Sequence, residues 1–185
     1  MFIQTESTPN PATLKFLPGR EVLGDRVMDF PDREAAEASP LATALFEIPE
    51  VTRVFFGSDF ISVTKSTGEW QHLKPAILGA IMDHFTRALP LLTDASETTP
   101  DDHTLEDDSE VAQQIRELLD TRIRPAVAQD GGDIVFRGFD EKSGTVFLYL
   151  RGSCSGCPSS RMTLKNGIEN MLRHYIPEVS AVEAV

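Results

Sequence analysis

The stretch Gly152-Ser153-Cys154-Ser155-Gly156-Cys157-Pro158-Ser159-Ser160 holds the only two cysteines of the 185-residue chain. It follows an apolar segment, 145–150, and precedes a segment with helical periodicity. Pro158 suits the first position of that helix, so the cysteine turn lies directly before the helix start. Cys154 and Cys157 are therefore predicted to point into one small space, where helix N–H groups and the helix dipole stabilise thiolates.

Two thiolates in such a turn have three possible roles. They can ligate a metal or an iron–sulfur cluster, they can exchange with disulfides, or they can be inert buried cysteines. A thioredoxin-like redox site also places two cysteines between a strand and a helix. That fold needs further strands downstream, however, and only 28 residues follow Cys157. The sequence therefore favours metal or cluster ligation over redox chemistry.

Histidines do not complete a zinc site, which needs four ligands. His174 is the only histidine among residues 109–185, and it lies about 25 Å along the predicted helix from the cysteine turn. His72, His84 and His103 show no metal-ligand spacing. We expect none of the four histidines to be a ligand.

The number of cysteines points to a shared site. An iron–sulfur cluster is normally held by four thiolates, and this chain supplies two. The other pair must come from a second copy of the protein or from external thiols, and a symmetric dimer would provide four ligands from two identical turns. Arg151, Arg161 and Lys165 lie close by in sequence and either lessen the charge of a cluster or are ordinary surface cations.

Charge and composition exclude several classes of protein. The net charge of −12 argues against nucleic acid as a main partner, and residues 94–110 alone carry eight acidic and no basic side chains. No apolar run is long enough to cross a bilayer. Two cysteines cannot form a disulfide framework, and the N-terminus lacks the patterns of a signal or transit peptide. These features predict a reducing cytosol as the setting of the protein.

The pattern of apolar residues predicts an α+β protein of two small domains. Residues 1–92 form a βββαββα module, with strands and helices at 2–6, 13–17, 22–30, 39–46, 51–56, 60–64 and 73–89. Ser39 is expected to cap the first helix and Pro40 to begin it. In the second helix, apolar residues recur at every fourth position: Ile77, Ile81, Phe85 and Leu89.

The acidic segment 93–108 is predicted to be a flexible linker, because a self-repelling polar run cannot offset its ordering entropy by burial. Residues 109–185 then form an αββαβ module. Ser109 is expected to cap its first helix, Pro125 to break or bend it, and residues 130–133 to end it. Strands follow at 134–139, 145–150 and 179–185, and the helix from Pro158 to Pro177 is expected to bury Leu164, Ile168, Met171, Leu172 and Tyr175.

At this point the motifs resemble a known family. Asp130-Gly131-Gly132-Asp133, the cysteine turn, and Thr163-Leu164-Lys165-Asn166-Gly167-Ile168-Glu169 are similar to the NifU-like C-terminal (Nfu) domain. Ile3-Gln4-Thr5-Glu6-Ser7-Thr8-Pro9-Asn10-Pro11 and Thr13-Leu14-Lys15-Phe16 are similar to the Nfu N-terminal domain.

The resemblance implies a non-enzymatic scaffold or carrier. Such a protein binds a [4Fe–4S] cluster, or a [2Fe–2S] cluster, between two protomers through Cys154 and Cys157 of each. It receives the cluster from upstream assembly proteins and passes it to client apo-proteins such as lipoyl synthase or respiratory enzymes. For the N-terminal domain, client recognition is one hypothesis, and simply steadying the structure is the alternative. The two-domain arrangement resembles that of mitochondrial and alphaproteobacterial members, and the lack of a transit peptide favours the bacterial form in the cytoplasm, or the mitochondrial matrix if the chain is a processed eukaryotic form. The rival interpretations are a redox module that cycles a Cys154–Cys157 disulfide and an interaction protein with a dimeric zinc site.

Overall fold

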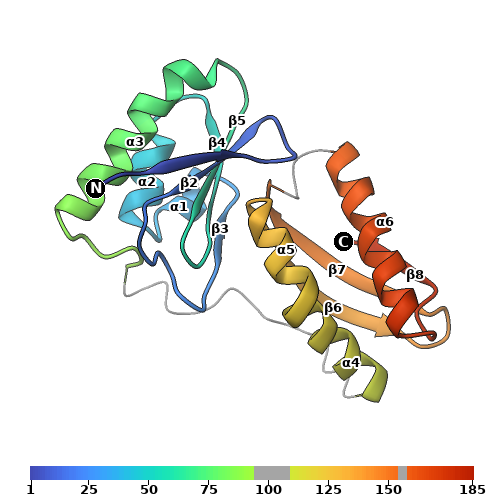
Figure 1. Ribbon diagram of the computed structural model, residues 1–185. Coiled ribbons are helices and arrows are strands. Elements are labelled where there is room, and N and C mark those ends of the chain that lie inside the picture. Colours follow the sequence, from blue (N-terminus) through green and yellow to red (C-terminus); the bar gives the residue numbers. More distant parts are fainter. Residues whose placement is uncertain (94–108, 154–157) are drawn as a thin grey trace. The chain divides into compact units, whose positions relative to one another are not determined.

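The computed structural model describes residues 1–93, 109–153 and 158–185 (Figure 1). These residues form two α+β units, each with a hydrophobic core of its own, so the predicted fold class is confirmed. Most of the predicted linker, 94–108, lies outside the described residues. Thr93 packs with the first unit, where its backbone N–H donates to the carbonyl of Ala38 at 2.9 Å. None of the described helices is both long and apolar enough to cross a membrane.

The first unit is a five-stranded antiparallel sheet with helices on one face (Figure 1). The strand order is β1-β2-β5-β4-β3. The strands are β1 (Gln4–Ser7), β2 (Thr13–Leu17), β3 (Met28–Phe30), β4 (Val51–Phe56) and β5 (Ile61–Lys65), and the helices are α1 (Arg33–Ala36), α2 (Pro40–Phe46) and α3 (Trp70–Thr86). Phe16, Val54 and Val63 from the sheet pack against Leu45 and Ile77 from the helices.

Local sequence signals account for several boundaries of the first unit. Ser39 accepts a hydrogen bond from the Ala42 N–H at 3.2 Å and Pro40 begins α2, both as predicted. The hairpin between β4 and β5 requires Gly57, because a Cβ there would lie 2.3 Å from the Phe60 ring. The sequence therefore specifies this part of the fold through short-range contacts.

The predicted strand at 22–30 is too long, since only β3 (Met28–Phe30) is extended. The chain turns at Gly24, whose φ is +61°, and the N–H groups of Val22 and Leu23 donate to the carbonyl of Ser58 instead of to a neighbouring strand. The first unit also contains a one-turn helix, α1, that was not predicted. Asp32 caps it by accepting from the Ala35 N–H at 2.8 Å.

The third helix, α3, ends earlier than its apolar repeat suggests. It stops at Thr86, and Ala88 adopts a positive φ of +50°. Leu89, predicted to belong to the buried stripe, is 37% exposed. His84 takes the last buried position of the helix instead.

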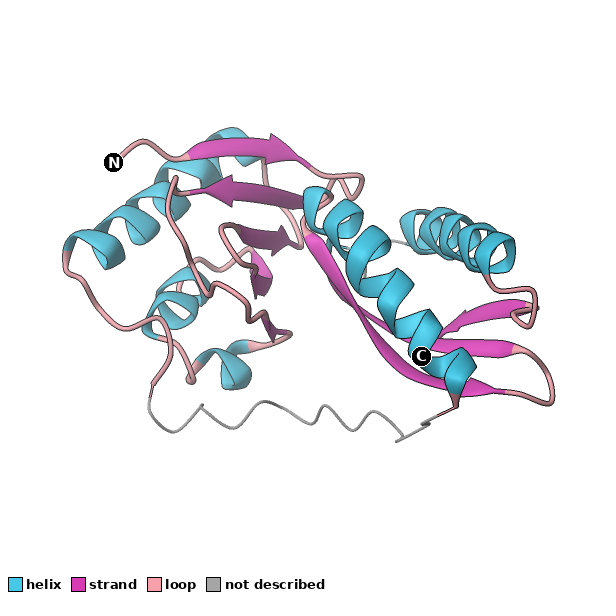
Figure 2. Cartoon of the chain, turned by 60° about the horizontal axis from the view of Figure 1, so that its bottom comes forward, coloured by secondary structure: helices cyan, strands magenta, loops and turns pink. Residues whose placement is uncertain are grey.

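The second unit follows the predicted αββαβ order. Its elements are α4 (Glu110–Leu118), the π-helical turn η2 (Leu119–Ile123), α5 (Arg124–Gln129), β6 (Gly132–Asp140), β7 (Thr145–Gly152), α6 (Pro158–Tyr175) and β8 (Ala181–Ala184). β6 pairs antiparallel with β7, and β8 pairs parallel with β7. The α4–α5 run and α6 cover the same face of this three-stranded sheet (Figure 2).

The first helix of the second unit changes form just before Pro125, where a break or bend is predicted. The π-helical turn η2 separates α4 from α5 and accommodates the missing N–H and the ring of Pro125. The predicted buried face of α6 needs correction. In α6, Ile168 and Leu172 form the buried stripe, and the buried Ile176 follows directly after the helix. Met171 and Tyr175, predicted to be buried, are 36% and 47% exposed. Ser109 caps α4 as predicted, by accepting from the Ala112 N–H at 3.2 Å.

Candidate functional site

The cysteine turn joins the end of β7 to the start of α6. Gly152 and Ser153 are the last described residues before it, and Pro158 is the first residue of α6 after it. Cys154 and Cys157, the predicted ligands, lie outside the described residues. The structure therefore defines the two anchors between which the four residues 154–157 run, as the sequence predicted.

The strand-side anchor is tied to the end of α5. The Ser153 hydroxyl donates a hydrogen bond to the carbonyl of Asp130, and the Ser153 N–H donates to the carbonyl of Gly131 at 3.3 Å. Ser153 is 2% exposed. Gly152 and Gly131 adopt φ values of +65° and +79°, which favour glycine. The residue directly before Cys154 is thus held at both its backbone and its side chain.

An ion pair between Arg124 and Asp133 connects α5 to the start of β6. The buried carboxylate of Asp133 accepts two hydrogen bonds from the Arg124 guanidinium, from Nε at 2.9 Å and from Nη2 at 3.2 Å. Nη1 of Arg124 also donates to Asp120 at 3.2 Å. Burial acts to lower the pKa of Arg124, but the hydrogen bonds and charges of Asp133 and Asp120 outweigh burial and raise that pKa. The Arg124 guanidinium therefore stays charged, and its hydrogen bonds to Asp133 fix α5 to the start of β6.

The helix-side anchor is the N-terminus of α6. This helix runs for 18 residues from Pro158, so its unsatisfied N–H groups and the positive end of its dipole face the turn that carries the cysteines. Such an environment favours thiolates over thiols. Both anchors suit a pair of cysteine ligands for a soft metal or an iron–sulfur cluster.

The cations near the turn are placed in different ways. Arg151 is the register partner of Asp133 across β6 and β7, and its Cζ lies 5.8 Å from the centre of the Tyr149 ring. Arg161 and Lys165 are half-buried on α6. Their role in lessening the charge of a cluster remains a prediction.

His174 lies in the last turn of α6, exposed, with its ring 5.1 Å from that of Tyr175. It is sixteen residues beyond Pro158, about 24 Å along the helix. Among the residues that the structure describes, no three His, Cys, Asp or Glu side chains gather as a metal site.

Comparisons with known proteins cover both units. Residues 3–88 match the family described as scaffold protein Nfu/NifU N terminal, and residues 115–183 match the NifU-like domain. The human protein named NFU1 iron-sulfur cluster scaffold homolog, mitochondrial, is 57% identical over the whole chain, which spans 72% of that protein. The chain belongs to the Nfu/NifU family.

Other members of the Nfu/NifU family are similarly close. NifU-like protein 4, mitochondrial, of Arabidopsis thaliana is 54% identical over 99% of this chain, and the NFU1 homolog of Drosophila sechellia is 55% identical over all of it. The chain spans 65% of each of these two proteins. Both domains inferred from the motifs of the sequence are thus confirmed as Nfu/NifU domains.

Sequence reasoning missed the residues that hold this Nfu/NifU turn in place. The motif at 130–133 was interpreted as a helix end, whereas Asp133 is also the partner of Arg124, and the Asp130 carbonyl accepts from Ser153. The signal available was an acidic residue at a strand start, which is expected to be buried only with a partner. An arginine nine residues earlier could have supplied that partner.

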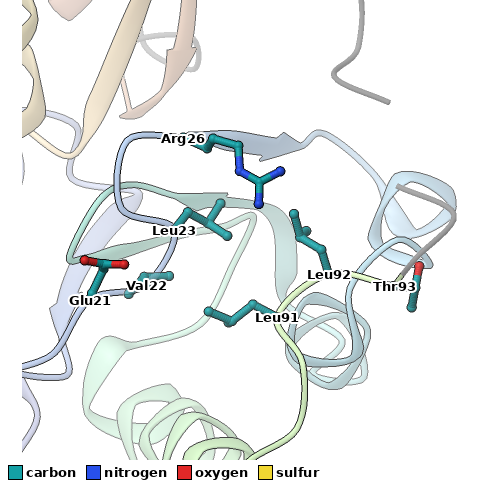
Figure 3. A pocket seen from close by; sticks show the side chains of 7 residues that line it. All are labelled: Glu21, Val22, Leu23, Arg26, Leu91, Leu92 and Thr93. Carbon is teal, nitrogen blue, oxygen red and sulfur yellow. The ribbon is translucent and has the colours of Figure 1, made fainter. Parts of the chain in front are cut away.

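The first unit carries a surface hollow of about 300 Å³ (Figure 3). Leu23, Leu91 and Leu92 line it, with Glu21 and Arg26 at its edge (Figure 3). Val22 and Thr93 complete the lining. None of these seven residues is a nucleophile or a metal ligand of the kind that the cysteine turn offers, so the hollow does not compete with that turn as the site of chemistry.

Proposed function

We propose that this protein is a non-enzymatic scaffold and carrier for iron–sulfur clusters. Its cargo is a [4Fe–4S] cluster held between two protomers by Cys154 and Cys157 of each, with [2Fe–2S] as the alternative cargo. The observation that carries the proposal is the anchoring of the residues on both sides of a turn that contains only two cysteines. Relatives named as iron–sulfur cluster scaffold homologs support it.

The fit between site and cargo rests on three features. The donors are sulfurs, which suit iron–sulfur clusters. The start of α6 favours their thiolate form. Ser153 is fixed to Asp130 and Gly131, so the residue that precedes the first cysteine has a defined position.

Incomplete ligation accounts for transfer. Each protomer supplies half of the four thiolates, so the cluster lies at a seam between copies where other thiolates can reach it. We propose that the thiolates of a client apo-protein replace Cys154 and Cys157 one pair at a time. Each exchange forms one iron–sulfur bond and breaks another, and the displaced cysteine leaves as a thiolate. No electron is transferred, and release of the cluster separates the dimer.

Partners and compartment follow from the same role. The clients are apo-proteins that need iron–sulfur clusters, and upstream assembly proteins supply the cluster. The relatives are named mitochondrial, which supports the mitochondrial matrix, rather than the bacterial cytoplasm, as the setting. We propose that the first unit contributes to client recognition, since it contains no cysteine.

Anaerobic reconstitution with iron and sulfide tests the proposal. A brown dimer that transfers its cluster to an apo-acceptor, and that forms only when both cysteines are present, is the expected result. A colourless protein with disulfide reductase activity would favour the redox interpretation. Bound zinc without sulfide would favour a structural metal site. Cys154→Ser and Cys157→Ser are the test variants, and Ser155→Ala is the control within the same turn.

A further inference from the structure

Over residues 161–172, the helix that follows the cysteine turn presents an uncharged face to solvent, and the exposed Arg173 marks the far end of this face. Six residues of α6 between positions 161 and 172 are exposed, and they are Met162, Thr163, Asn166, Gly167, Asn170 and Met171. The charged residues of this stretch, Arg161, Lys165 and Glu169, are half-buried. In a chain with 25% charged residues, a solvent-facing helix surface normally carries charge.

Glu169 shows how the charged residues are used at the edge of this face. Its carboxylate accepts a hydrogen bond from the Val182 N–H at 3.1 Å and lies 3.7 Å from Nη1 of Arg173. It therefore connects α6 to the start of β8 and does not belong to the open face.

Two residues of the uncharged face are unfavourable in a single protomer. Met162 is 67% exposed, although its side chain is apolar. Gly167 lies in the middle of the helix, where glycine is the least favourable residue apart from proline. A Cβ at Gly167 would meet no atom within 4 Å, so the packing of the described residues does not require a glycine there. A chain that approaches α6 closely from outside would require one.

We propose that this face of α6 is the surface through which two copies of the chain contact each other. The inference rests on the cluster-bridged dimer proposed above. The face begins at Met162, five residues after Cys157, on the helix that the turn leads into. Two cysteine turns that share one cluster bring the first halves of two α6 helices together, so the uncharged face continues the seam at which the cluster lies.

The lack of charge identifies a second copy, rather than a different protein, as the occupant. In a two-fold symmetric contact, residues near the axis meet the same residues of the partner. A charge there would face its own like charge, and each copy already carries a net charge of −12. A contact with a different protein has no such restriction, because opposite charges can be matched across it.

A charge-reversal pair at Met162 tests this inference. The full-length Met162→Glu and Met162→Lys variants are reconstituted anaerobically, iron and sulfide are counted, and dimerisation is measured by sedimentation equilibrium. Each variant alone is expected to raise the dimer dissociation constant roughly tenfold or more, because like charges meet at the seam. An equimolar mixture of the two is expected to regain the wild-type value, because Glu then faces Lys.

Met82 provides the matched control. It is 42% exposed on α3 of the first unit, and Met82→Glu and Met82→Lys are expected to leave dimerisation unchanged. Dimers of wild-type affinity for both Met162 variants would overturn the inference and leave the cluster-bridged dimer standing. Intact dimers with impaired transfer to an apo-acceptor would assign the face to clients and contradict it. If the wild-type protein takes up no cluster, the proposed function fails, and this inference fails with it.

Discussion

The guanidinium of Arg124 holds the buried carboxylate of Asp133 with two hydrogen bonds, of 2.9 and 3.2 Å. This pair joins α5 to the first residues of β6, and Asp133 is the register partner of Arg151 on the strand that leads into the cysteine turn. An ion pair between residues nine apart in sequence, outside the cysteine motif, thus holds the pair of strands that leads into the turn.

Arg124→Leu is expected to lower the free energy of unfolding of the second unit by about 2 kcal/mol. The substitution leaves the Asp133 carboxylate buried without its cation, while the partial exposure of Arg124 moderates the loss. Urea unfolding followed by circular dichroism measures the change. The fluorescence of Trp70, which lies in the first unit, should report an unchanged transition. Arg87→Leu, which removes the exposed Arg87–Asp83 pair, is the control and should have little effect.

Ser153→Ala is expected to shorten the lifetime of the bound cluster. The variant loses the hydrogen bond from the hydroxyl to the Asp130 carbonyl, which contributes about 1 kcal/mol and restrains the residue before Cys154. Decay of the visible absorbance of the loaded protein measures the lifetime. Ser143→Ala removes a hydroxyl that bonds Asp140 and Thr145 in an exposed loop, and it should leave the lifetime unchanged. Equal decay rates for the wild type, Ser153→Ala and Ser143→Ala would contradict the anchoring role of Ser153.

His84 is expected to make the first unit less stable in mild acid. The side chain is 3% exposed, and its Nε2 has no hydrogen-bond partner within the described part of the chain. Burial lowers the pKa of His84 below 6.5, and the charge of Asp83 opposes that shift only in part. The unfolded chain therefore binds the proton more readily. Stability is complete above pH 6.5 and falls as the pH drops from there toward the folded pKa, by up to about 1.4 kcal/mol per pH unit.

Unfolding of the first unit, followed by Trp70 fluorescence, tests this dependence. The measurements run from about pH 5 to about pH 8, on both sides of the ordinary histidine pKa of about 6.5. His84→Leu should flatten the profile. His72→Leu, at an exposed position of the same helix, should reproduce the wild-type profile. A wild-type slope retained in His84→Leu would show that other groups cause the acid sensitivity.

Gly167→Ala is expected to act in opposite directions on stability and dimerisation. Alanine favours the helix by about 1 kcal/mol over glycine and meets no neighbour in the protomer, so the melting temperature should rise. The added methyl group should weaken the cluster-bound dimer if another α6 approaches at this point. Gly79→Ala in α3 is the matched control, since a Cβ there also meets no atom within 4 Å. Gly79→Ala should stabilise the first unit without affecting the dimer. A Gly167→Ala variant that also leaves the dimer unaffected would contradict the close approach of a second chain at α6.

Local sequence signals predicted much of the fold, because their physical causes act within a few residues. The Ser39 and Ser109 caps depend on hydrogen bonds three residues ahead. The turn at Gly144, with a φ of +67°, uses the backbone freedom of one glycine, although the close approach of Glu178, whose carbonyl oxygen would lie 2.7 Å from a Cβ, also requires a glycine there. The β-strands on either side of that turn were predicted for the same reason, although β6 and β7 extend beyond the predicted ranges.

Features that depend on distant residues could not be predicted in the same way. The N–H groups of residues 22–24 donate to the Ser58 carbonyl. This stretch therefore turns and does not form the strand that the apolar pattern of 22–30 predicted. The pairing of Ser153 with Asp130 spans 23 residues. The cysteine motif itself indicated iron–sulfur chemistry, and relatives of the chain are named iron-sulfur cluster scaffold homologs. The contacts that hold the turn required the structure.

The central claim is that two copies of the turn containing Cys154 and Cys157 hold one iron–sulfur cluster. Mössbauer spectroscopy, with iron and sulfide counts, on anaerobically purified protein beside its Cys154→Ser variant tests this claim most directly. The account predicts a [4Fe–4S] spectrum with about two irons and two sulfides per protomer, absent from the variant. Wild-type protein without sulfide, or a variant that retains the wild-type spectrum, would contradict it.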